Sequence, residues 1–422
     1  MRTINTQILA ADRAEANLGE FHDITSKKQD SSVIGYYITL FILLQHDIII
    51  FGYIISAGKG VRKMDIEKLA QRYESYWNRE NEDRPLVYMT TSAYRIPVER
   101  DDAHPSFRDA WMDTEYVIKK ARRAIEASIF LGEGYPMLNP NLGPDLVGAV
   151  CGCDLEFGAI TSWSKPCIDE YETFGEIKFD ENNPYWKKIC EITEAALEDS
   201  RGDYIVGITD LHPGADAVAA LRGPENAAFD LYDYPDEFKK AVWDVFPVFK
   251  EMTTHLHSMI SQKQKFSSCW MGIIQPTELW YPTSCDFSCM ISPANYEEFI
   301  LPELIEEVKW LPNSVYHLDG PDALRHLDTI LSIKELKGVQ WVYGAGQPSA
   351  RYWIDVLKKI QDAGKCVQVG CNAKDLLPLC EALDPRGVHF RCGVSDRESG
   401  EYLLREMERI CREKRGQFFV TK

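Results

Sequence analysis

Short apolar runs alternate with amphipathic stretches along the chain from about residue 84 onward. Helices are expected between the runs, and three of them begin at a proline, which suits the first helical position: Pro184, Pro293 and Pro348. Repeated strand–helix units join parallel strands through right-handed crossovers. The pattern therefore predicts an α/β protein with a single (β/α)8 barrel, and an open doubly wound sheet is the alternative. The runs expected to form strands are Leu86–Thr90, Leu146–Gly152, Tyr204–Thr209, Met271–Ile274, Asp286–Met290, Val315–Leu318, Val339–Val342, Val367–Val369 and Val388–Arg391.

The first 63 residues do not follow this alternation. Residues 33–57 form an apolar run whose only formal charge is Asp47, and this run is long enough to cross a membrane. The basic residues after it would then place the rest of the chain in the cytoplasm. Two other readings stay open: a helix buried in the fold, or a functional protein that starts at Met64, where an amphipathic helix begins. We expect an N-terminal extension over residues 1–63 and a barrel over residues 64–422.

Composition narrows the class of partner. The 422 residues include 65 acidic and 47 basic ones, so the net charge is −18, and phosphate binding by clustered basic residues is not expected. Nucleic acid is therefore set aside as a partner. The 12 cysteines show no repeat or paired spacing, which favours a reducing, cytoplasmic location. A membrane partner is expected only if residues 33–57 are a real anchor.

Polar residues at the ends of predicted strands are the candidates for chemistry, because the active site of such a barrel lies at the carboxyl ends of its strands. His317 and Asp319 are two residues apart on one strand, so their side chains point to the same side. Cys392 ends the last predicted strand. Three ligands with one open position are typical of catalytic zinc. The alternative is that Asp319 caps the next helix and Cys392 is a core thiol.

Two further runs carry ionisable or aromatic side chains next to predicted strands. One follows the strand at residues 204–209 and is dense in ionisable groups, although a helix cap with a solvated histidine would also explain it. The other follows the strand at residues 271–274, where the aromatic residues could equally be packing. The catalytic candidates are Asp210, His212 and Glu278, and the candidates for a substrate pocket are Trp280, Tyr281 and Tyr343.

Several stretches resemble the uroporphyrinogen decarboxylase superfamily. The similarity is carried by Asp286–Pro293 with the helix after it, by Leu221–Glu225, by Asn141–Asp145 and by the strand around His317. It extends from about residue 85 to 410. The resemblance implies a single (β/α)8 barrel, which agrees with the alternation of strands and helices.

The superfamily contains tetrapyrrole decarboxylases and zinc-dependent methyltransferases that use methylcobamides or related methyl carriers. The decarboxylases carry an R-Q-A-G-R-Y segment after the first strand, where this chain reads M-T-T-S-A-Y-R at Met89–Arg95. The methyltransferases carry H-x-C on one strand and a cysteine on a later one. His317 and Cys392 match this pattern, and Asp319 stands where the middle cysteine would be.

The resemblance implies an enzyme that moves a methyl group between a corrinoid, carried by a partner protein, and a small thiol-type acceptor at a zinc site. Asp319 would supply a harder ligand than cysteine, which leaves zinc expected but opens the site to other divalent ions. Two alternatives remain. One is a decarboxylase of porphyrin metabolism, and the other is a non-catalytic barrel that binds a ligand or a corrinoid protein.

Overall fold

The computed structural model describes residues 65–93, 104–276 and 278–418. The predicted extension over residues 1–63, with its apolar run 33–57, and the boundary at Met64 lie outside the described residues and stay predictions. Among the described residues, no helix combines the length and the apolar character that a bilayer crossing needs.

The strands are short and the helices vary from one turn to more than seven. The strands are β1 (Leu86–Ser92), β2 (Ser128–Gly132), β3 (Met137–Leu138), β4 (Asp154–Phe157), β5 (Ser162–Lys165), β6 (Ile205–Val206), β7 (Ser267–Ser268), β8 (Ile274–Gln275), β9 (Trp280–Ser284), β10 (Asn313–Asp319), β11 (Gly338–Val342), β12 (Cys366–Asn372) and β13 (Val388–Gly393). The helices are α3 (Ile66–Trp77), α4 (Phe107–Met112), α5 (Thr114–Glu126), α6 (Leu146–Val150), α7 (Tyr171–Phe174), α8 (Pro184–Ser200), α9 (Gly214–Arg222), α10 (Pro224–Asp233), α11 (Pro235–Ser261), α12 (Pro293–Asn295), α13 (Leu301–Trp310), α14 (Leu327–Leu331), α15 (Ile354–Asp362), α16 (Leu376–Ala382) and α17 (Arg397–Phe418). Five short 3-10 or π turns are η1 (Asp286–Met290), η2 (Tyr296–Ile300), η3 (Pro321–His326), η4 (Ala350–Trp353) and η5 (Ala373–Asp375).

Seven strands form one sheet in the order β2-β1-β13-β12-β11-β10-β9, and β2 alone pairs antiparallel in it. A separate parallel pair joins β3 to β6. Eight strands thus have a parallel partner, which is the number that a (β/α)8 barrel requires. In the described residues, however, no ladder of hydrogen bonds links the β3–β6 pair to the main sheet. The predicted α/β class is confirmed, and the strands of the described residues are arranged like a barrel but do not form a closed one.

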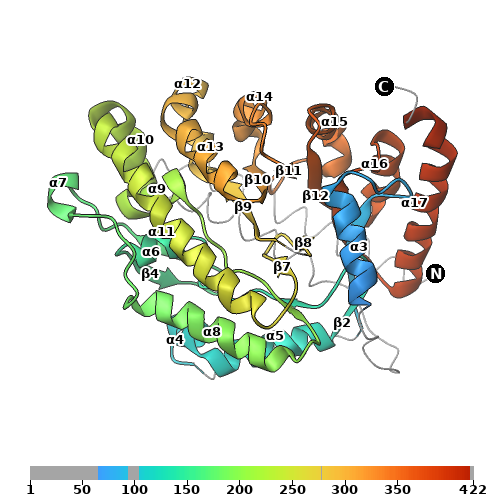
Figure 1. Cartoon of the computed structure of the whole chain (residues 1–422), viewed down its shortest axis with the longest axis horizontal. Coiled ribbons are helices and arrows are strands. Elements are labelled where there is room, and N and C mark those ends of the chain that lie inside the picture. Colours follow the sequence, from blue (N-terminus) through green and yellow to red (C-terminus); the bar gives the residue numbers. More distant parts are fainter. Residues whose placement is uncertain (1–64, 94–103, 277, 419–422) are drawn as a thin grey trace, which may run out of the picture. The chain divides into compact units, whose positions relative to one another are not determined.

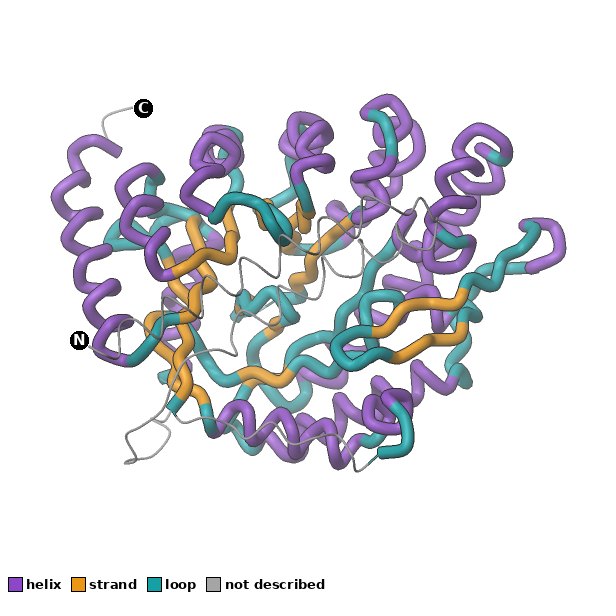
Figure 2. Tube along the Cα trace, turned by 180° about the vertical axis from the view of Figure 1, so that it is seen from behind, coloured by secondary structure: helices purple, strands orange, loops and turns teal. Residues whose placement is uncertain are grey.

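Helices cover the outside of this sheet. Figure 1 shows α10, α13, α14, α15 and α16 following one another across the upper part of the view, outside the strands β9 to β12, with α5 and α8 along the lower side. In the reverse view the strands lie between these two groups of helices (Figure 2). Strand residues are therefore buried on both faces, as parallel sheets require. The predicted helix after Met64 is present as α3, which buries Leu69, Tyr73, Tyr76 and Trp77.

Three of the predicted strands are placed differently in the structure. Leu146–Gly152 begins as the helix α6, which is buried on all sides, so its apolar run has no periodicity that separates a helix from a strand. Asp286–Met290 is the 3-10 turn η1, because backbone amides at its start are bound by a carboxylate instead of a neighbouring strand. The strand expected at Met271–Ile274 is β8, which starts at Ile274 and pairs antiparallel with β7.

Candidate metal centre

The carboxyl ends of β9 and β10 bring together three side chains of types that can bind metals. His317 and Asp319 lie two residues apart on β10, and Asp286 lies two residues beyond β9. The two strands are neighbours, with Ser284 opposite His317. One ligand atom from each of Asp286, His317 and Asp319 lies within 4.8 Å of the other two. We call this group the His317 site.

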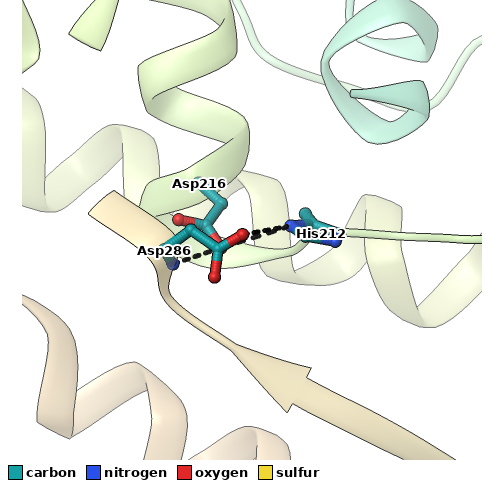
Figure 3. A group of neighbouring side chains, drawn as sticks. All are labelled: His212, Asp216 and Asp286. Atoms are coloured by element: carbon teal, nitrogen blue, oxygen red, sulfur yellow. Dashed lines mark hydrogen bonds and ion pairs between the residues drawn. The ribbon is translucent and has the colours of Figure 1, made fainter. Parts of the chain in front are cut away.

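A second group shares one member with the first. His212 follows β6, and Asp216 lies in the first turn of α9. The Nδ1 atom of His212 is 3.6 Å from Asp216 Oδ2 and 3.7 Å from Asp286 Oδ2. Figure 3 shows these two carboxylates pointing toward the imidazole of His212. We call the group of His212, Asp216 and Asp286 the His212 site.

Asp216 also fixes the position of Asp286. Its carboxylate accepts hydrogen bonds from Ser284 Oγ at 3.1 Å, from Asp286 N at 3.0 Å and from Phe287 N at 2.9 Å. These bonds turn the chain from β9 into η1. The turn carries the Asp286 side chain back toward both histidines, because His317 Nε2 is 3.7 Å from its Oδ1 atom.

Neighbouring side chains hold the imidazole of His317 in one orientation. Its Nδ1 atom makes a short hydrogen bond to the side-chain oxygen of Gln340, which lies opposite it on β11. The edge of Trp270 also contacts the ring, with 5.2 Å between the ring centroids. With Nδ1 donating to Gln340, the lone pair of Nε2 faces Asp286. This arrangement leaves Nε2 available to a metal ion.

The charges of the two sites do not balance within the protein. Together with Asp210, whose Oδ1 is 3.4 Å from His212 Nε2, they contain four carboxylates and two imidazoles. In the described part of the chain, the ion pairs of these carboxylates are all made with the two histidines. Even with both imidazoles protonated, the cluster keeps an excess of negative charge. Burying such charge is costly without a proton or a cation to offset it.

The pKa shifts reflect this imbalance. Burial and the nearby carboxylate of Asp286 raise the pKa of Asp319 to about 7. Burial raises the pKa of Asp286 as well, although His317 opposes that shift. Burial alone would lower the pKa of His212, but the surrounding carboxylates, Asp210 first, raise it well above 6.5. The Oδ1 atoms of Asp286 and Asp319 are shielded from solvent and have no hydrogen-bond partner among the described residues.

Glu278 and Trp280, two of the predicted site residues, lie at the amino ends of β9 and β10, opposite to the end that carries the His317 site. Glu278 is exposed just before β9 and accepts a hydrogen bond from Asn313 Nδ2, at the start of β10, at 3.0 Å. Trp280 begins β9, packs in the core against Trp77 and donates a hydrogen bond to the carbonyl of Ser267. Both were expected beyond the carboxyl end of a strand. They do follow the short strand β8, but they lie at the amino end of β9, and their roles in catalysis and in a substrate pocket stay predictions.

Tyr281 lies in the core next to the Asp210–His212 segment. It is fully buried, and its hydroxyl donates a hydrogen bond to Thr209 O and accepts one from Leu211 N at 2.7 Å. These two bonds hold the backbone on both sides of Asp210. Tyr281 thus supports the Asp210–His212 segment, and its role in a substrate pocket stays a prediction.

Tyr343 and Cys392 lie on the later strands. Tyr343 follows β11, and burial together with Cys371 raises the pKa of its hydroxyl to about 12. Cys392, near the end of β13, lies opposite Cys371 on β12, and its thiol donates to Gly393 O at 3.3 Å. Cys392 belongs to neither group of metal-binding atoms in the described residues. Its role as a ligand and the role of Tyr343 in a pocket stay predictions, as do the catalytic roles of Asp210 and His212.

Three residues of the centre were absent from the candidates: Asp216, Asp286 and Gln340. Asp286 follows the end of β9 by two residues, close to the rule that singled out Asp319, but its segment was itself taken for a strand. Asp216 stood in the same dense run as His212 and could have been chosen on that ground. Gln340 had no signal in the sequence, because only the pairing of β10 with β11 places it opposite His317.

Comparisons with known proteins bear on the fold. No family model matches the chain, and no curated protein matches it either. A solved structure of a methyltransferase from Methanosarcina mazei is similar, with a TM-score of 0.52 and 12% sequence identity. The similarity covers 81% of this chain and 98% of the methyltransferase. The chain therefore shares its α/β fold with this methyltransferase.

Proposed function

We propose that the protein is a metal-dependent methyltransferase that transfers a methyl group to a thiol-type acceptor at the His317 site. The observation that carries the proposal is the convergence of Asp286, His317 and Asp319 at the strand ends, with ligand atoms within 4.8 Å of one another. The similarity in fold to a methyltransferase supports the class of reaction. So does the sequence resemblance, in which His317 and Cys392 match metal ligands.

The residues of the His317 site suit a divalent cation. One imidazole nitrogen and two carboxylates are ligands that zinc accepts, and the carboxylates also suit harder ions such as Mn²⁺. A cation would offset the charge that raises the pKa of Asp319. We propose zinc as the resident ion and Cys392 as a further ligand, supplied from β13.

The bound ion would supply a positive charge that lowers the pKa of the acceptor thiol, so that the thiolate is the nucleophile. The protein would contribute orientation, through Gln340 on His317 and through Asp216 on the Asp286 turn. In the transfer, a bond forms between the acceptor sulfur and the methyl carbon while the bond from that carbon to its carrier breaks. The electron pair stays with the carrier, and the thiol proton leaves to solvent.

We propose a methylcobamide, presented by a partner corrinoid protein, as the methyl donor, and a cytoplasmic location. Both rest on the resemblance and on the cysteine content of the chain. The segment Met89–Arg95, which lacks the arginine-rich motif of the decarboxylases and so counts against that alternative, lies partly outside the described residues.

The test combines elemental analysis with an assay of methyl transfer. Purified protein is expected to contain a stoichiometric divalent metal and to demethylate methylcobalamin in the presence of a thiol, followed by the change in cobalamin absorbance. His317→Ala is expected to lose the metal of the His317 site and at least 100-fold in rate, on the order of 3 kcal/mol in transition-state stabilisation. Cys392→Ser is expected to lower metal affinity.

Asp328→Asn is the matched control, because Asp328 is 82% exposed and pairs with Lys359 away from the centre. It is expected to keep both the metal and the rate. Protein without bound metal, or a metal content that His317→Ala leaves unchanged, would contradict the proposal. Metal binding without methyl transfer to any thiol would keep the site and refute the reaction.

A further inference from the structure

The two groups of ligand atoms meet at one carboxylate. Asp286 Oδ1 faces His317 Nε2 at 3.7 Å, and Asp286 Oδ2 faces His212 Nδ1 at 3.7 Å. Each oxygen of this carboxylate is thus directed at a different imidazole. A carboxylate whose two oxygens serve different ligand sets is the arrangement found where two metal ions share a bridge, as in enzymes with paired ions about 3.5–4 Å apart.

The separations within the His212 site fit an ion between the ligands. Charge-assisted N–H···O bonds are about 2.7–2.9 Å long, which is much shorter than the 3.6 and 3.7 Å that separate His212 Nδ1 from Asp216 Oδ2 and Asp286 Oδ2. Ligands that surround one tetrahedral ion at about 2.0–2.2 Å lie about 3.4 Å from one another. The observed gaps are therefore close to those between ligands of one ion.

His212 is also oriented as a metal ligand would be. Its Nε2 atom faces Asp210 Oδ1 at 3.4 Å, on the side away from Asp216 and Asp286. When a cation displaces the proton on Nδ1, the proton that stays on Nε2 is directed at Asp210, and the lone pair of Nδ1 lies between the two carboxylates. A carboxylate that orients the far nitrogen of a ligating histidine is the usual support of such ligands. The side chain of His212 is 11% exposed, so solvent screens the interaction between the imidazole and these carboxylates only weakly.

We propose that the protein binds a second divalent cation at the His212 site, and that Asp286 bridges this cation to the one at the His317 site. The inference rests on the proposed function only in taking the His317 site as occupied. Each position brings together one imidazole and two carboxylates, with Asp286 in common. The second cation would offset the negative charge that remains around His212 and would add a position for an oxygen ligand of the substrate.

The test counts the ions and asks whether they are coupled. Chelator-stripped protein is titrated with Mn²⁺, the bound equivalents are counted, and electron paramagnetic resonance is recorded. The wild type is expected to bind two equivalents with the signal of an exchange-coupled pair. His212→Ala and His317→Ala are each expected to bind one equivalent with the signal of an isolated ion, and Asp286→Asn to lose the pair.

Folding is checked by circular dichroism, and His212→Asn replaces His212→Ala if the alanine variant does not fold. Asp328→Asn is expected to keep both ions. The second site is overturned if the wild type binds one equivalent of Mn²⁺ and His212→Ala retains it, or if the wild type binds no ion at all. Two equivalents without coupling overturn the bridge. Two coupled ions without methyl transfer leave this inference standing and refute the proposed function. Methyl transfer by a protein that binds one ion supports the proposed function and overturns the second site.

Discussion

Single residues at the strand ends were predictable where strand geometry alone decides their direction. His317 and Asp319 are two apart on a strand, so their convergence followed from the sequence, and the structure brings them within reach of one ion. Asp286 did not follow, because its position depends on the turn that Asp216 imposes through backbone amides. Such a side-chain contact between segments 70 residues apart leaves no local pattern.

Gln340 is expected to set the metal affinity of the His317 site. Its side-chain oxygen fixes the imidazole of His317, and removal of such a partner typically lowers metal affinity 10–100-fold. Gln340→Leu is therefore expected to weaken binding by about that factor in a competition with a fluorescent chelator. Gln368→Leu is the control, since Gln368 is a buried glutamine opposite Gln340 on β12. Equal affinity in the two variants would contradict the assigned role.

Asp319 is expected to set the choice of metal. A carboxylate is a hard ligand and a thiolate is a soft one, so Asp319→Cys is expected to raise the preference for zinc over Mn²⁺. The ratio of the two dissociation constants measures this preference, and an increase of at least about tenfold is expected. Asp319→Asn separates the effect of softness from that of lost charge, because it removes the charge without adding sulfur. If Asp319→Cys left the ratio of the two dissociation constants unchanged, Asp319 would not be a ligand of the ion.

At the scale of elements, the pattern of apolar runs predicted the later strands well. β10 to β13 are five to seven residues long and mostly buried, and each was anticipated with errors only at its ends. β9 was missed because its sequence W-Y-P-T-S contains a proline and two hydroxyl residues, which favour a turn. The structure tolerates Pro282 because β9 is the edge strand of the main sheet.

Tyr281 shows how β9 supports the centre. Its hydroxyl binds both Thr209 O and Leu211 N, so Tyr281→Phe leaves a buried amide and a buried carbonyl unpaired. The expected loss is about 1–3 kcal/mol in the free energy of unfolding, measured with denaturant, together with weaker metal binding at the His212 site. Tyr204→Phe is the control, because its hydroxyl binds Ala196 O and Asp199 remote from the centre. Its stability is expected to fall without a change in metal affinity.

At the scale of the whole molecule, alternation of strands and helices predicted a barrel-like fold, but not how completely the barrel closes. Closure depends on the β3–β6 pair, and these strands are only two residues long. A run of two residues carries too little periodicity to be found in a sequence. The same limit applies to charge, because the net charge of −18 does not tell which acids are buried. Among the acids that the structure buries are Glu303 and Glu307, which lie one turn apart on α13.

Glu303 makes the stability of the protein depend on pH. Burial, with Asp216 nearby, raises the pKa of Glu303 from 4.5 to about 8, and its Oε1 has no hydrogen-bond partner among the described residues. Between these two values the unfolded chain has released the proton while the folded chain keeps it. Unfolding therefore releases a proton, and this contribution to stability falls as the pH rises from 4.5 to about 8.

Glu303→Gln replaces the titratable carboxyl with a neutral amide. It is expected to raise the free energy of unfolding at pH 8 by a few kcal/mol, while leaving it nearly unchanged at pH 4. Denaturant titrations at several pH values measure the slope. Glu306→Gln is the matched control on the same helix, because Glu306 is 46% exposed and pairs with Lys309. That variant is expected to keep the wild-type slope. If Glu303→Gln also kept that slope, Glu303 would be ionised in the folded protein at neutral pH, and a cation would have to lie close to its carboxylate.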